Sequence, residues 1–137
     1  MTNVRGIRNN NPLNIRKGNN WKGERPIQTD KQFEEFETLQ YGIRAGLKLI
    51  RNHVSGFGGK RPKANSIRKL INVWAPPSEN ATQGYIVFVC QQVTKLPDDI
   101  IHDDDQALIC KIARAMAFFE CGQWIDYAQF ESAWFLK

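Results

Sequence analysis

The sequence predicts a mainly α-helical fold, a single domain built around one buried central helix with a small β-hairpin near the N-terminus. The chain has 137 residues, 42% of them hydrophobic, which suits one domain with one apolar core. Apolar side chains recur at helical spacing from residue 38 onward. Residues 104–120 are apolar on nearly every side, as is typical of a helix in the middle of a domain.

The first 37 residues form the least regular part of the chain. They are rich in Asn, Gly, Pro and basic residues, which favours ordered loop structure. Two short segments, 13–15 and 33–36, have the spacing of strands, so we expect at most one small hairpin. Within a single domain over 1–137, residues 1–37 are therefore expected to line a cleft and residues 38–137 to form the helical part.

Five helices are expected in the helical part, and local signals mark their ends. Thr38 and Asn65 or Ser66 are suited to cap helix starts, and carboxylates at 103–105 favour the positive end of another helix dipole. Gly122 is suited to reverse the chain just past that helix. The expected ranges are 39–54, 66–74, 81–96, 104–120 and 127–136.

The net charge of +5 is unevenly distributed along the chain. Residues 1–70 contain 15 basic and 5 acidic side chains, whereas residues 71–137 contain 4 basic and 9 acidic ones. A basic front half favours an anionic partner. One class of such partner is DNA, to which the basic loop at residues 60–63 would be suited, but no helix-turn-helix or RNA-binding motif accompanies it.

The sequence gives no sign of a metal, a cofactor or a membrane segment. The three cysteines lie at unrelated spacings among apolar neighbours, which predicts buried free thiols, and the two histidines lie far apart. No apolar run is long enough to cross a bilayer or to serve as a secretion signal, which predicts synthesis in the host cytoplasm without membrane insertion. The cysteines are Cys90, Cys110 and Cys121.

Glu120 is the first candidate for chemistry because it ends the most apolar helix. Burial and the negative end of the helix dipole both disfavour its ionised form, and a general acid must hold a proton. An exposed glutamate at a fraying helix end is the alternative interpretation. A second candidate is the N-terminal asparagine cluster with Trp21, since amides can bind sugar hydroxyl groups and an indole can stack on a sugar ring. The alternative interpretation is an asparagine-rich turn whose side chains bond to their own backbone. Those asparagines are Asn9, Asn10, Asn11 and Asn14.

Four stretches of the chain resemble, in the same order, a family of small bacteriophage and prophage proteins with a lysozyme-like α+β domain. They read RGIRNNNPLNIRKGNNWKGE, FEEFETLQYGIRAGLKLI, WAPPSENATQGYIVFVC and LICKIARAMAFFECG. The family motif NNNPGNI has Leu13 in place of its glycine here, and the Glu-Asn-Gly motif reads Glu120-Cys121-Gly122. Flagellar-type glucosaminidases carry similar motifs in the opposite order, from which we infer a circular permutation that leaves Glu120 beside the asparagine segment.

The resemblance implies a peptidoglycan hydrolase that cleaves the β-1,4 bond of the glycan strand, as a muramidase or a lytic transglycosylase. Glu120 is then the acid. A hydrolytic mechanism needs a second carboxylate, for which Asp30 is the first candidate and Glu24 the next. Thr29 would line the cleft beside Asp30, and Tyr85 would hydrogen-bond the substrate or the acid, although a buried packing tyrosine is equally consistent with the sequence.

Two other classes of protein remain open from the sequence. One is a wall-binding or virion structural module that keeps the fold without catalysis, and the other is a basic DNA-binding phage protein. The partner we expect is the peptidoglycan glycan strand rather than nucleic acid, bound by a monomer without a cofactor. The protein would reach the cell wall inside a virion or after a holin opens the membrane.

Overall fold

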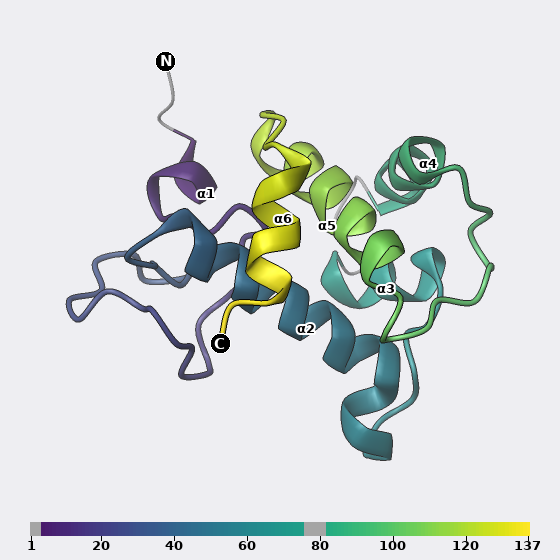
Figure 1. Cartoon of the computed structure of the whole chain (residues 1–137), viewed down its shortest axis with the longest axis horizontal. Helices are drawn as coiled ribbons and strands as arrows, with labels where there is room; N and C mark the ends of the chain where they lie inside the picture. Colours follow the sequence, from purple (N-terminus) through teal and green to yellow (C-terminus); the bar gives the residue numbers. More distant parts are fainter. Residues whose placement is uncertain (1–3, 76–81) are drawn as a thin grey trace.

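In the computed structural model the described residues are 4–75 and 82–137, and they are mainly helical (Figure 1). The helices are α1 (Arg5–Arg8), α2 (Leu39–Gly59), α3 (Ile67–Trp74), α4 (Thr82–Val93), α5 (Gln106–Cys121) and α6 (Tyr127–Trp134). None of the helices in these ranges is both long enough and apolar enough to span a membrane. The mainly α class predicted from the sequence is confirmed.

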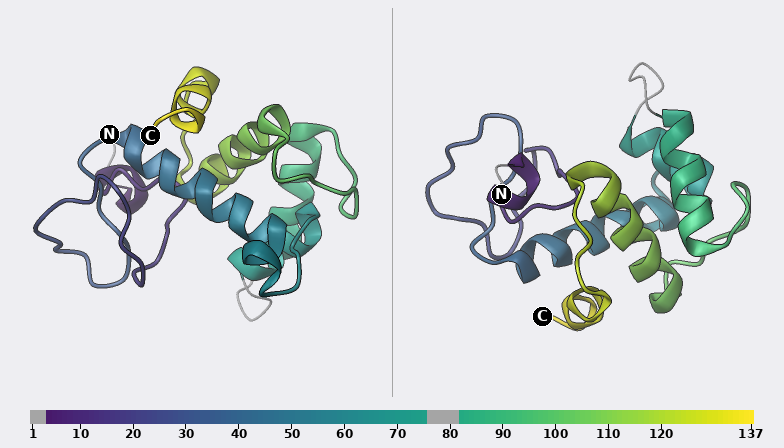
Figure 2. Two further views of the ribbon diagram at one scale, coloured as in Figure 1. Left: turned by 60° about the horizontal axis from the view of Figure 1, so that its bottom comes forward. Right: turned by 90° about the horizontal axis from the view of Figure 1, so that it is seen from above.

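Helix α5 lies at the centre, as its composition predicts. Eight of its residues are buried, and α2, α4 and α6 all pack against it. Figure 2 shows α5 crossing α2, with α6 on one side and α4 on the other. The main hydrophobic core gathers around these helices, and Leu13 from the N-terminal segment joins it. All three cysteines are free and buried.

The local signals at the helix ends act as predicted. The side chains of Thr38, Ser66 and Asp105 accept hydrogen bonds from the first turns of α2, α3 and α5, and Gly122 ends α5 in the left-handed conformation with φ of 72°. Helix α4 ends at Val93, three positions before the predicted residue 96, because Thr94 turns the chain with φ of 56°. Residue 81, the expected first residue of this helix, lies outside the described residues.

The N-terminal segment, residues 4–37, does not form the expected hairpin. Its strand-like contacts are two isolated bridges, Arg16 with Phe33 and Glu24 with Phe36. Side chains hold the loops together instead. Asn11, fully buried, donates to the carbonyls of Ile15 and Glu34 and accepts from the Ile15 amide. Each such bond replaces a rung that a strand ladder would supply.

This segment docks onto α2 through two glycines. A Cβ atom on Gly42 would lie 1.6 Å from the Asn10 carbonyl oxygen, and one on Gly46 would lie 2.2 Å from a methyl group of Leu13. Leu13 is fully buried and its φ is not positive, so the side chain that replaces the family glycine fits as an apolar anchor. Only glycine at these two positions permits such close approach.

Candidate functional site

The carboxyl group of Glu120 lies at the junction of α5 with the N-terminal segment. The Asn14 side chain donates from Nδ2 to Glu120 Oε1 at 2.9 Å, although the two residues are 106 positions apart. Asn14 has a left-handed backbone with φ of 53°, a conformation that asparagine tolerates better than most residues. Both side chains are half-buried. The juxtaposition inferred from the motif order is therefore present.

Tyr85 approaches the same carboxylate from α4. Its side chain is 2% exposed, and its ring stacks on Phe119 with centroids 4.1 Å apart. Burial raises the pKa of Tyr85, and the charge of Glu120 together with a hydrogen bond to that carboxylate raises it further. The Tyr85 hydroxyl also lies 3.5 Å from the Met116 carbonyl oxygen, so its burial and stacking fit the packing role that the sequence left open as well. Three separate parts of the chain thus meet at Glu120.

Cys121 and Gly6 also pack at this junction. The Cys121 thiol donates to the Pro12 carbonyl at 3.2 Å, and burial raises its pKa to about 12, so the thiol is protonated and unreactive at neutral pH. A Cβ atom on Gly6 would lie 2.5 Å from that sulfur and 2.8 Å from Asn14 Oδ1. Helix α1 therefore packs directly against the end of α5.

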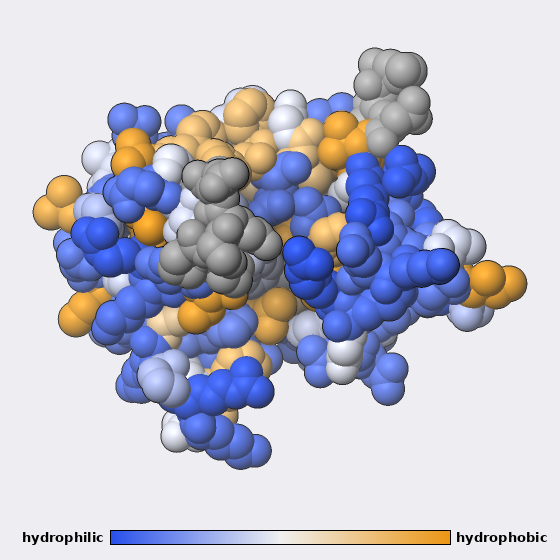
Figure 3. Space-filling view, turned by 180° about the vertical axis from the view of Figure 1, so that it is seen from behind, coloured by the Kyte–Doolittle hydropathy of each residue, from blue (hydrophilic) through white to orange (hydrophobic). Residues whose placement is uncertain are grey.

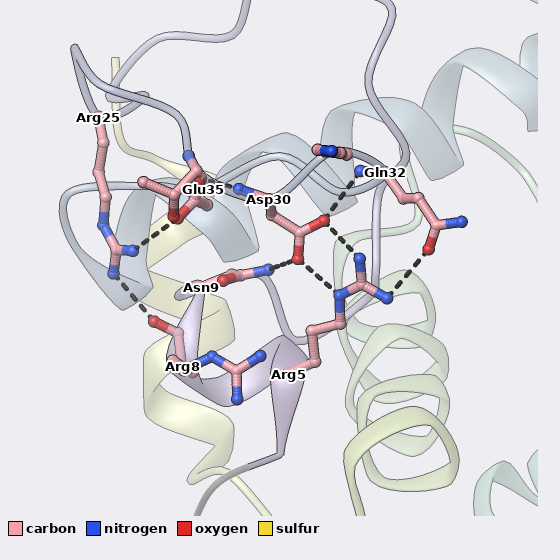
Figure 4. Close-up of a pocket in the computed structure, with 9 residues that line it drawn as sticks. Arg5, Arg8, Asn9, Arg25, Asp30, Gln32 and Glu35 are labelled. Atoms are coloured by element: carbon pink, nitrogen blue, oxygen red, sulfur yellow. Dashed lines mark hydrogen bonds and ion pairs between the residues drawn. The ribbon is translucent and has the colours of Figure 1, made fainter.

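Asp30 belongs to a different group of residues, shown in Figure 4. Arg5 donates to both of its oxygens at 2.6 Å, Asn9 donates at 3.0 Å, and the amides of Gln32 and Phe33 donate as well. The Arg5 guanidinium holds the pKa of Asp30 well below its usual value, with the other donors adding to the effect. The carboxylate is 6% exposed. This geometry makes Asp30 an anchor of the N-terminal segment.

Glu35 holds the neighbouring loop in the same way. It accepts from the Thr29 hydroxyl at 2.9 Å, from the amides of Thr29 and Asp30, and from Arg25. Burial by itself would raise the pKa of Glu35, but these donors outweigh it, so the pKa is lowered. Thr29 is thus held by a buried carboxylate, and its role in lining a substrate cleft stays a prediction.

The remaining predicted binding residues point mostly into the protein. Asn9 is bonded to Asp30, Asn10 to the Phe36 carbonyl, and Asn11 to its own segment. Trp21 packs on a small cluster formed by Ile15, Phe36 and Ala45. Of the four asparagines, only Asn14 has a bond to Glu120 among the contacts described above.

A surface pocket of about 670 Å³ is lined by residues of α1 and by residues between positions 25 and 35. We call it the basic pocket. Its lining includes Asp30, Glu35 and four cationic side chains, Arg5, Arg8, Arg25 and Lys31. The two predicted carboxylates therefore belong to different places, since Glu120 sits at the end of α5 and Asp30 in the wall of the basic pocket.

Sequence reasoning missed Arg5, Gly6 and Glu35. The sequence carried a signal for Glu35 in the two consecutive glutamates between Phe33 and Phe36, because a short buried segment cannot keep two carboxylates without donors. Gly6 lies between basic residues and has no comparable signal. Within residues 4–75 and 82–137, no group of three or more His, Cys, Asp or Glu side chains could hold a metal ion.

Comparison with known proteins finds similarity over part of the chain. No family model matches the chain. Over 93 residues it is 44% identical to Protein P5 of Pseudoalteromonas phage PM2, a match that covers 65% of this chain and 55% of the phage protein. The chain thus spans about half the length of the curated relative that it matches. What these comparisons establish is similarity to a bacteriophage protein.

Proposed function

We propose that this protein cleaves the β-1,4 glycosidic bond of the peptidoglycan glycan strand by general acid catalysis, with Glu120 as the acid. The observation that supports this most is the hydrogen bond between Asn14 and Glu120. It joins two motifs that the sequence singles out separately, one at each end of the chain. The family resemblance supports the choice of substrate, and the phage relative is consistent with a lytic role.

In the proposed mechanism, Glu120 donates its proton to the bridging oxygen as the bond from that oxygen to the sugar carbon breaks. Positive charge then develops on the sugar ring, and Glu120 is left as a carboxylate. Asn14 acts as a positioning residue that fixes one carboxyl oxygen, and Tyr85 holds the carboxylate from the side of α4. Both side chains are neutral, so neither places a formal positive charge beside Glu120.

Which nucleophile attacks the sugar carbon depends on whether Asp30 can act as a second catalytic carboxylate. A hydrolytic route needs a carboxylate that can activate water, but the oxygens of Asp30 already accept five hydrogen bonds, from Arg5 (two), Asn9, Gln32 and Phe33. This occupancy favours the lytic transglycosylase route. There the Glu120 carboxylate takes a proton from the substrate's own hydroxyl group, which attacks the sugar carbon and leaves an anhydro end. The muramidase route with Asp30 remains the second prediction.

The test is lysis of purified sacculi, followed as a loss of turbidity. Glu120→Gln is expected to lower the rate by a factor on the order of 10² to 10⁴, because the amide cannot donate the proton. Glu37→Gln removes an exposed carboxylate outside the site and is expected to retain the wild-type rate. Full activity in Glu120→Gln would refute the proposal.

The same preparation separates the product types and the other classes of protein. Mass spectrometry of the released muropeptides distinguishes anhydro from reducing ends, and so the two routes. A wall-binding or virion structural module would bind sacculi without lysing them. A DNA-binding protein would do neither. Under the proposal the protein acts on the cell wall, reached from a virion or through a membrane opened by a holin.

A further inference from the structure

Four aromatic side chains pack together at the end of α5 and leave part of their surface open to solvent. Trp124, in the turn after α5, stacks on Phe118 with ring centroids 4.3 Å apart, and both rings contact Phe88 of α4. Phe119 also contacts Phe88; it is 36% exposed, and Trp124 is 45% exposed. We call these four side chains the aromatic platform. Figure 3 shows hydrophobic surface along the upper edge of the molecule, at the end where Figure 1 places the C-terminus of α5.

The aromatic platform adjoins the proposed acid. Phe119 precedes Glu120 in the chain, and its ring stacks on Tyr85, the residue that hydrogen-bonds the Glu120 carboxylate. Trp124 follows Glu120 by four residues, so their Cα atoms would be at most about 14 Å apart even in an extended chain. Gly122 turns the chain between them with φ of 72°, which makes the separation shorter still. A ligand that lies on the platform is therefore within reach of the acid.

A pocket of about 290 Å³ lies beside Trp124 and is lined by residues of α4, α5 and α6. Gln92 and Lys111 are exposed at this pocket, and both carry hydrogen-bond donors. Arg114 Nε donates to the Ile125 carbonyl at 2.6 Å, and the guanidinium lies over the Trp124 ring, 4.8 Å from its centroid. These contacts fix the indole in place. The pocket thus combines a rigid aromatic side with a polar side.

This combination matches the two kinds of surface on a sugar ring. The C–H groups of the ring form an apolar face that packs on an aromatic side chain, and the hydroxyl and acetamido groups at its edge accept hydrogen bonds. An apolar partner would cover the platform but leave the donors of the pocket unpaired, which is unfavourable. Trp21, the residue that the sequence assigned to sugar stacking, packs instead on a small core cluster that includes Ile15 and Phe36.

We propose that the aromatic platform binds sugar rings of the glycan strand beside the bond that is cleaved, with Trp124 as the main stacking residue. The inference deepens the proposed function and rests on it, since it assigns further contacts to the same substrate. Phe119 supplies the stacking surface nearest to Glu120. Gln92 and Lys111 donate to the hydroxyl or acetamido groups of a ring held in the pocket beside Trp124.

Glycan binding to the Glu120→Gln variant tests the inference without interference from turnover. The probe is a peptide-free tetrasaccharide of the glycan strand, titrated by calorimetry. Trp124→Leu, added to the same background, keeps an apolar side chain over Phe118 but removes the flat ring. It is expected to weaken binding by about tenfold, whereas Trp124→Tyr retains a flat ring and should keep most of the affinity.

A second measurement does not depend on how well Trp124→Leu folds. The indole N–H resonance of Trp124, assigned by its absence from the spectrum of Trp124→Tyr, should shift when the tetrasaccharide is added to the Glu120→Gln protein. The matched control is Phe135→Leu, which removes an aromatic ring that is 72% exposed just after α6. In the Glu120→Gln background it should bind the tetrasaccharide with unchanged affinity.

Two results would overturn the inference. One is full affinity in Trp124→Leu together with an unshifted Trp124 resonance, and the other is an equal loss of affinity in Phe135→Leu. The proposed function fails by a different result, full lysis of sacculi by Glu120→Gln, which the binding measurements do not involve.

Discussion

Asp30 and Glu120 are both carboxylates with asparagine partners, yet their surroundings differ in kind. The donors to Asp30 all come from residues 5–33, the segment that contains it, and they include a guanidinium. Two partners of Glu120 come from other parts of the chain, Asn14 before α2 and Tyr85 on α4, and these two are neutral. A carboxylate tied by charge to its own loop stabilises that loop. A carboxylate whose neutral partners come from separate elements lies at a junction of those elements, where a functional site can form.

The largest expected stability effect that tests this contrast is at Asp30. Asp30→Asn replaces a charged acceptor of Arg5 with an amide, which leaves the guanidinium without its fork partner. We expect a loss on the order of 2 kcal/mol in the free energy of unfolding at pH 7. Lysis by the remaining folded protein should change little under the one-carboxylate route. Urea denaturation and the sacculus assay, run on the same samples, measure both quantities.

The pH dependence of that loss has a defined sign. The folded-state pKa of Asp30 is lowered by Arg5 first and by Asn9 and two amides next, so its stabilisation is complete at neutral pH. It declines as the pH falls below about 4, the ordinary range of an aspartate, toward the folded-state value. The gap between wild type and Asp30→Asn should therefore narrow in acid. Asp98→Asn, which breaks the exposed pair with Arg68, is the control and should show little loss at either pH. A gap at Asp30 that stays constant down to pH 3 would mean that shape, and not charge, holds the loop.

The fold was predictable at the helix ends, where a side chain bonds to backbone groups only a few residues away. The helix starts at Thr38, Ser66 and Asp105 and the end at Gly122 depend on side chain to backbone bonds within three or four residues. The expected hairpin does not form, and the prediction failed because the short apolar spacing in residues 13–36 also fits loops held together by side chains. The alternation of those residues does not reveal that hydrogen bonds of the Asn11 side chain take the place of a β-ladder.

The site was predictable only in part, for a related reason. Glu120 stands out by its place in an apolar helix, but Asn14 looks no different in sequence from Asn9, Asn10 or Asn11. Their separate roles depend on backbone turns and on partners more than 20 positions away. The basic pocket likewise depends on the pairing of Arg5 with Asp30, which lie 25 positions apart. No periodicity in the sequence predicts that pairing.

A smaller effect is expected from removing the Asn14 side chain. Asn14→Gly keeps a residue that accepts positive φ, so the loss should come mainly from the bond to Glu120. Misplacing the acid is expected to lower the lysis rate by about tenfold, in line with about 1.5 kcal/mol for a hydrogen bond to a charged group. The alkaline limb of the pH–activity profile should also move to higher pH. The Asn14 amide favours the ionised form of the acid, and the variant lacks that donor.

Thr94→Gly provides the matched control for Asn14→Gly. It places glycine at another left-handed position, with φ of 56°, in an exposed loop that follows α4. It should leave both the rate and the pH–activity profile of lysis unchanged. If Asn14→Gly lowers the rate without moving the profile, Asn14 serves the fold and not the acid.

The smallest effect, and one of opposite sign, is expected at Glu34. This carboxylate is buried in the same segment as Asp30, but burial raises its pKa and the nearby charge of Glu24 raises it further, against a weaker opposing effect of Lys17. A raised pKa means that Glu34 favours the folded state when protonated and loses that benefit as the pH rises above the usual glutamate range. Glu34→Gln should therefore stabilise the protein at pH 7 by less than the Asp30 loss, and the gain should fade toward pH 4. Thermal unfolding across that range, with Glu37→Gln as the exposed control, measures it. If Glu34→Gln instead destabilises the protein most at pH 7, the ion pair with Lys17 outweighs the repulsion by Glu24, and Glu34 acts like Asp30.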